Sequence, residues 1–131
     1  MLDADKTSLV EIASRAAFKP TLERLIQGIE AAGMAIFAQI DHAAGARAIG
    51  VLMPPATVLI YGHARGGTPI MLAAPKAALD LPLRVLVRES EDSRTLVSFH
   101  PIGAALRQMG VTDMLTIRLE SAQQLLEQLI P

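Results

Sequence analysis

Apolar and polar residues recur along this chain with two different periods, which predict its strands and helices. Alternation over residues 8–15 predicts a first strand. The next apolar residues recur with the spacing of one helix face, at Leu22, Leu25, Ile26 and Ile29. That helix should begin at Phe18 and end at Gly33, a residue free to adopt a left-handed cap.

Two continuous apolar runs, Met34–Ile40 and Val58–Tyr61, predict strands that are buried on both faces. A short helix capped by Asp41 should follow the first run. A glycine-rich loop over 62–67 should follow the second, and Thr68-Pro69 there resembles the cap and first residue of another helix. The middle of the chain therefore alternates strand and helix.

The second half of the chain predicts a β-hairpin followed by two helices. Leu83–Arg88 alternates in polarity, and a polar turn leads from it to a second strand over Thr95–His100. Helices should then cover 101–110 and 113–130. The order β-α-β-α-β-α-β-β-α-α predicts a single α+β domain over residues 1–131, a two-layer sandwich with a mixed sheet of about five strands.

Composition adds an excess of apolar residues, which make up 51% of the chain. The longest apolar stretches, Met34–Ala38 and Met53–Tyr61, are far shorter than the ~20 residues that a membrane span requires. The start, with Asp3, Asp5 and Lys6, lacks the pattern of a signal peptide. We therefore expect a cytoplasmic protein without a membrane segment, whose apolar excess lies in a homodimer interface.

Charge and residue usage exclude several function classes. The chain has no cysteine, which excludes disulfides, iron–sulfur clusters, thiolate zinc sites and cysteine catalysis. Its 12 basic and 13 acidic residues leave no electrostatic footprint for nucleic acid. Aromatic residues make up 3% of the chain, too few for a base-stacking platform.

Four consecutive stretches, residues 37–46, 52–62, 66–71 and 80–87, carry motifs of a known family. They resemble the F-x-x-I-D-H-x-x-x-A signature, the L-x-P-T-x-L-I-F-G strand, the G-T-P-L-M turn and the D-L-P-L-K-x-L-V strand of the family called domain of unknown function 302. The resemblance covers roughly residues 8–110 and implies a small, homodimeric α+β domain without an assigned activity. Members typically carry G-N-P-K where this chain has Gly62-His63-Ala64-Arg65.

Two loops are the candidate ligand site, because ligands favour the carboxyl ends of parallel strands. If the two apolar strands run parallel, the turn after one strand and the loop after the other lie together. The candidate residues are Asp41, His42, Gly62, His63, Arg65, Gly66, Gly67 and Thr68. Free N–H groups at Thr68 and the charge of Arg65 suit a small anionic ligand, and the Asp41-His42 pair suits proton transfer or a polar contact.

Two other interpretations stay open. The glycines of the loop also suit simple turns and Asp41 and Thr68 suit helix caps, which fits a structural or interaction protein. Alternatively, Asp41, His42 and His63 form a two-histidine, one-carboxylate set for iron or zinc in a metal-dependent enzyme. The sequence contains neither glycine-rich nucleotide fingerprint and indicates no particular cofactor or reaction.

Overall fold

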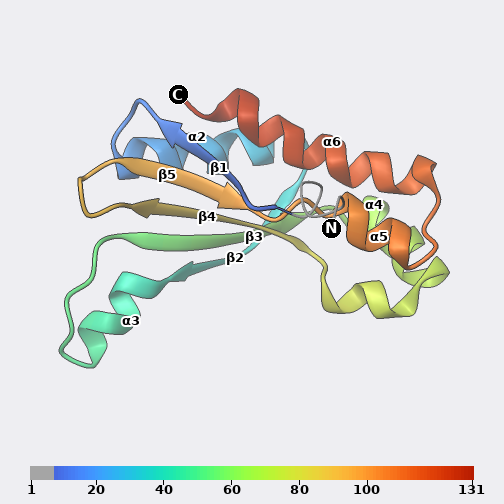
Figure 1. The fold of residues 1–131 in the computed structure, drawn as a ribbon, viewed down its shortest axis with the longest axis horizontal. Helices are drawn as coiled ribbons and strands as arrows, with labels where there is room; N and C mark the ends of the chain where they lie inside the picture. The colour runs from blue at the N-terminus through green and yellow to red at the C-terminus, as the bar shows by residue number, and fades with distance from the viewer. Residues whose placement is uncertain (1–7) are drawn as a thin grey trace.

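The computed structural model describes residues 8–131, so the N-terminal residues considered for a signal peptide lie outside the described part. The strands are β1 Val10–Ser14, β2 Ala35–Asp41, β3 Ala56–Gly62, β4 Leu83–Glu89 and β5 Thr95–Phe99. The helices are α2 Phe18–Ala31, α3 His42–Ala48, α4 Ala64–Ala73, the 3-10 helix η1 Pro75–Leu79, α5 Gly103–Gln108 and α6 Asp113–Leu129. The predicted α+β class and the order of its elements are confirmed (Figure 1).

The five strands form one sheet in the order β1-β5-β4-β3-β2, and every neighbouring pair is antiparallel. The expected mixture of strand directions is therefore wrong. The connection between β2 and β3 consists of α3 and residues 49–55 and stays at one end of the sheet, because Asp41 at the end of β2 pairs with Thr57 near the start of β3. The chain therefore turns back beside β2, and β3 runs antiparallel to it.

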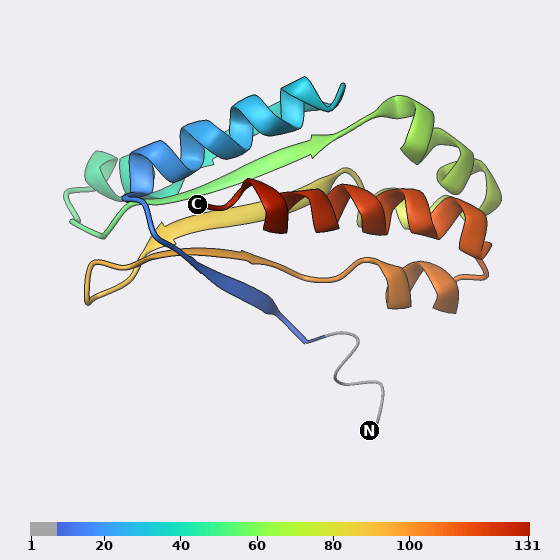
Figure 2. The ribbon, with the colours of Figure 1, turned by 90° about the horizontal axis from the view of Figure 1, so that it is seen from above.

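Helices α2 and α6 cover one face of the sheet and enclose the core (Figure 2). The predicted stripe on α2 holds, because Leu25 and Ile29 are fully buried. Opposite them lie alternate residues of the central strands, such as Leu59 and Val85. This packing leaves α2 no room for a side chain at Gly28, where a Cβ would collide with Leu129 of α6.

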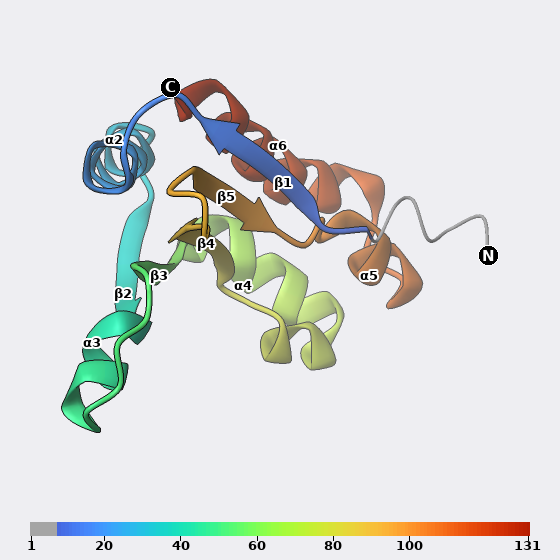
Figure 3. The same ribbon diagram turned by 60° about the vertical axis from the view of Figure 1, so that its left-hand side comes forward.

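Strand β2 is an exposed edge strand, which corrects the expectation that Met34–Ile40 is buried on both faces. Phe37 is 55% exposed and Ile40 is 44% exposed. A continuous apolar run indicates that both faces of a strand are buried, but it does not indicate whether the same chain or another chain buries them. Beyond β2, helix α3 and residues 49–55 project from the sheet and form what we call the arm (Figure 3).

Candidate ligand cavity

Strand β3 ends at a tight junction with helix α4. Gly62 has a φ of 156°, a conformation that residues with a side chain rarely adopt. His63 then caps the helix, and its Nδ1 atom accepts a hydrogen bond from the backbone N–H of Arg65 at 2.9 Å. Because Nδ1 is the acceptor, the neutral ring carries its proton on Nε2, which stays available as a donor.

Helix α4 begins earlier than the sequence predicted. It starts at Ala64 rather than at Thr68, and Pro69 lies inside it. Histidine is not among the preferred capping residues, so the pair Thr68-Pro69 gave the more conventional start. Residues 64–67, expected in a loop, therefore belong to the first turn of a helix.

The N-terminal backbone groups of α4 are largely satisfied by His63 itself. Its carbonyl accepts hydrogen bonds from Gly66 N at 3.0 Å and Gly67 N at 3.1 Å, and its ring accepts the N–H of Arg65. A cradle of free N–H groups for a phosphate is therefore not formed at this helix start. The weaker positive potential of the helix end remains.

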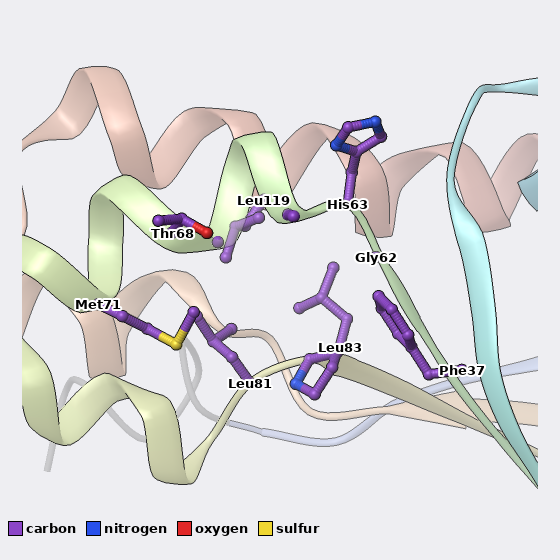
Figure 4. A pocket seen from close by; sticks show the side chains of 11 residues that line it. Phe37, Gly62, His63, Thr68, Met71, Leu81, Leu83 and Leu119 are labelled. Atoms are coloured by element: carbon purple, nitrogen blue, oxygen red, sulfur yellow. The ribbon is translucent and has the colours of Figure 1, made fainter.

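A cavity of about 210 Å³ lies between this junction, the turn before β4 and helix α6 (Figure 4). Its walls are mainly apolar and come from five elements and their junctions. The lining residues are Phe37, Gly62, His63, Ala64, Gly67, Thr68, Met71, Leu81, Pro82, Leu83 and Leu119. Such a site suits a small molecule with an apolar body.

The glycines of α4 shape this cavity. A Cβ on Gly67 would meet Met71 Cε at 3.8 Å and Leu81 Cδ1 at 3.9 Å, and one on Gly66 would meet Leu119 Cδ2 at 3.6 Å. Their missing side chains therefore leave space open between α4 and its neighbours. Figure 4 shows the Thr68 hydroxyl turned towards that space, whereas the ring of His63 points away from it.

The predicted site residues fall into two groups at opposite ends of the β2–β3 pair. Gly62, His63, Gly67 and Thr68 line the cavity. Gly66 lines a neighbouring cavity of about 240 Å³ that shares Leu119 with the first. Arg65 is exposed on the first turn of α4 and lines neither of these cavities.

Asp41 and His42 lie at the other end. Asp41 pairs with Thr57, whereas Gly62 pairs with Ala35. Six residues along a strand separate the two ends by roughly 20 Å at ~3.3 Å per residue. The Asp41 carboxylate accepts a hydrogen bond from Ala44 N at 2.9 Å and so caps α3. The expected convergence of the two loops is therefore wrong, because it assumed parallel strands.

The metal interpretation fails for the same reason. His63 is at the cavity end and cannot share an ion with Asp41 and His42. Within residues 8–131, no group of three or more His, Asp or Glu side chains is placed to hold a metal ion.

The apolar wall of the cavity was missed by the sequence interpretation. Phe37, Met71 and Leu119 come from β2, α4 and α6, and each looks like ordinary core filler in its own segment. Gly67 did not indicate the cavity either, because the sequence placed it in a loop, where glycine is common.

Tyr61 precedes this junction and points into the core. Its hydroxyl has no hydrogen-bond partner among the described residues, and neither has that of Thr116. Burial raises the pKa of the Tyr61 phenol above its ordinary value of 10.0. The phenol is therefore neutral in the folded protein.

Both the sequence and the fold of this chain are similar to those of known proteins. Residues 10–130 match the family described as domain of unknown function DUF302, so the match extends beyond residue 110 and through α6. The crystal structure of an uncharacterized conserved DUF302 protein from Bacillus stearothermophilus is similar, with a TM-score of 0.77. The superposition covers 93% of this chain and 94% of that one at 13% identity, which shows a shared fold.

Relatives of known name include the proteins named fluoride-specific ion channel FluC 1 of Brucella suis and of Brucella abortus. Each is 36% identical over 83 residues, which are 63% of this chain. The matched region is 33% of the first relative and 31% of the second, so the chain spans about a third of their length. Among residues 8–131, no helix is long and apolar enough to cross a membrane.

The match over almost the whole described chain, together with the shared fold, establishes that this chain belongs to the DUF302 family.

Proposed function

We propose that this chain acts as a single, cytoplasmic, homodimeric domain that binds a small amphipathic molecule in the cavity beside α4. The observation that carries the proposal is the cavity of about 210 Å³, with apolar walls and the Thr68 hydroxyl turned towards its space. Recognition sites for small molecules combine such walls with few polar groups that fix orientation.

The polar end of the ligand is inferred from the rim. Thr68 turns its hydroxyl towards the cavity. The positive end of the α4 dipole lies at the same junction. These groups favour a head that accepts hydrogen bonds and carries negative charge, such as a carboxylate. An apolar body then fills the space between Met71, Leu81 and Phe37.

Binding rather than catalysis is the function that this chemistry supports. His63 is the one ionisable side chain among the cavity's described lining residues. It has no carboxylate or nucleophile beside it there, as acid–base or covalent catalysis requires. The Asp41-His42 pair that suggested proton transfer lies at the far end of β2.

Thermal denaturation with a series of small probes tests the proposal. Octanoate and benzoate should raise the melting temperature, octanol less so and octylamine least, because a bound ligand stabilises the native state. Gly67→Leu should abolish the shift by filling the cavity, since a side chain there points at Met71 and Leu81. Gly45→Leu is the matched control, because Gly45 lies in α3 with no atom within 4 Å of its Cβ position.

Two results would contradict the proposal: no probe shifts the melting temperature, or Gly67→Leu retains the full shift. Sodium fluoride belongs in the same series, because of the name carried by the Brucella relatives. Apolar walls do not favour a small, strongly hydrated anion, so we expect no shift with fluoride. A shift with fluoride alone would favour a second function, as a fluoride-binding domain.

The homodimer is supported by apolar side chains that the described chain leaves exposed. Without a second copy, the chain is a structural or interaction protein with another partner. Light scattering of the purified protein at micromolar concentration tests the homodimer, and fractionation of cells tests the location.

A further inference from the structure

Several of the exposed large apolar residues lie on the arm and on the adjoining strand β2. Figures 1 and 3 show the arm extending beyond this edge of the sheet. We call this set the arm surface. Its members are Phe37, Ile40, Ile49, Val51, Leu52 and Met53. Leu52 is 89% exposed and Ile49 is 78% exposed, values that are unusual for large apolar side chains.

Strand β2 has only one of the features that protect an edge strand from pairing, the bulge between Ile36 and Ala38, and none over Ala38–Ile40. Natural edges carry lysine, proline or inward-pointing charges, whereas the one charged residue of β2 is Asp41, at its last position. A bulge displaces the strand between Ile36 and Ala38, and a regular run of four residues follows, from Ala38 to Asp41. No backbone hydrogen bond from this run other than those with β3 occurs within residues 8–131.

The exposed area fits one half of a dimer. From their exposed fractions, the six side chains present on the order of 600 Å² of apolar surface, the upper end of what monomers usually show. A standard interface buries about 800 Å² on each partner. The arm surface and the backbone edge of β2 together supply an area of that size.

We propose that the Ala38–Asp41 edge of β2 is the dimer seam, where two copies pair antiparallel about a two-fold axis and each arm packs against the partner subunit. This inference rests on the homodimer proposed above and names its surface. A two-fold axis across the strand makes the pairing antiparallel, the direction of every other pair in the sheet. The apolar run of β2 is then covered by a second copy of itself.

The seam runs beside the ligand cavity. Phe37 belongs to the arm surface and also lines the cavity, where it lies 3.9 Å from the Cβ position of Gly62. Dimerisation through β2 therefore covers the side of Phe37 that faces away from the cavity.

Single cysteines in this cysteine-free chain test the seam. Ala38→Cys, Gln39→Cys and Ile40→Cys place thiols along the regular run, and a disulfide forms when two Cα atoms come within about 4.4–6.8 Å. Ala13→Cys is the matched control, an exposed alanine on the other edge strand. Under mild oxidation, at least one β2 variant should form a covalent dimer and Ala13→Cys should not.

A second pair of variants tests whether the arm contributes to dimerisation. Leu52→Asp should weaken dimerisation at least about tenfold, as loss of a central interface residue does. Leu79→Asp should not, although Leu79 is 85% exposed, because it lies on η1 outside the arm surface. Circular dichroism of both variants checks that each is folded, which we expect because neither residue is buried.

The outcomes separate this inference from the proposals on which it rests. A monomer at micromolar concentration overturns the homodimer and the seam together. A dimer in which no β2 cysteine crosslinks, or in which Leu52→Asp dimerises normally, overturns the seam alone. Neither result bears on ligand binding, which the Gly67→Leu and Gly45→Leu comparison decides separately.

Discussion

Both ends of the β2–β3 pair carry polar residues that suggest a ligand site, but only one end lies beside a cavity. At one end, the junction at Gly62 meets α4, α6 and the turn before β4, and it encloses a cavity. At the other end, Asp41 and His42 lead into the arm, where the carboxylate of Asp41 caps a short helix. A cavity therefore forms where several elements converge, whereas reactive residues at the end of one strand pair do not form one.

The largest contrast should appear when a leucine is truncated at each end. Leu83, which is 3% exposed, lines the cavity and packs in the core. We expect Leu83→Ala to lower the free energy of unfolding by about 2–5 kcal/mol. Leu52→Ala, on the arm, should change it by less than about 0.5 kcal/mol in the monomer.

Urea denaturation at low protein concentration measures both values, with ligand absent. Equal losses at the two positions would mean that the arm is part of the folded core, and the contrast between the ends would be lost.

Alkaline pH should weaken the cavity end through Tyr61. The unfolded phenol ionises near pH 10, whereas burial raises the pKa of the folded phenol. This contribution to stability is therefore complete below pH 10 and is lost as the pH rises towards the folded pKa. Its slope approaches about 1.4 kcal/mol per pH unit.

Tyr61→Phe removes that ionisation and an unpaired buried hydroxyl. The variant should unfold less readily than the native chain at pH 11, and the advantage should shrink at pH 8. A native chain and a variant with identical pH profiles would show that the phenol is accessible to water or has a partner.

Removal of a helix cap should lower the free energy of unfolding by a smaller amount. The two ends of the β2–β3 pair differ in the side chain that forms the cap. Asp41→Ala removes the carboxylate cap of α3, and His63→Ala removes the ring cap of α4. Each substitution should lower the free energy of unfolding by about 1 kcal/mol. His63→Asn, which restores the residue that resembling sequences carry, should cost less, because asparagine caps helices well.

Thermal denaturation with octanoate separates these caps further. His63→Ala should reduce the ligand-induced shift because it removes the cap of α4, the helix that lines the cavity, whereas Asp41→Ala should leave the shift unchanged. A reduced shift in Asp41→Ala would mean that Asp41 takes part in ligand binding, although the strand register places it far from the cavity.

The local pattern of the sequence predicted the elements well because each depends on near neighbours. The stripe through Leu25 and Ile29 located α2, and the alternation from Leu83 to Arg88 located β4. Strand direction was not predictable in the same way. It depends on the path of the whole connection, and the sequence pattern of α3 and residues 49–55 does not show whether they cross the sheet or stay at one end of it.

Part of the candidate site was predictable because its residues are close neighbours in the sequence. Gly62, His63, Gly67 and Thr68 are close in sequence and lie together at the cavity. Leu119 reaches the cavity from another helix, more than 50 residues further along the chain. Contacts of that kind arise from packing, and an apolar residue that lines a cavity has the same sequence pattern as one that fills a core.

The cavity is tested most directly by backbone NMR of the full chain titrated with octanoate, because each amide reports its own surroundings. We expect the amides of Gly62, His63, Gly67 and Thr68 to shift progressively and saturate, while those of His42 and Ala44 stay unchanged. Shifts centred on α3 and the arm, or no saturable shift at either end, would contradict this expectation.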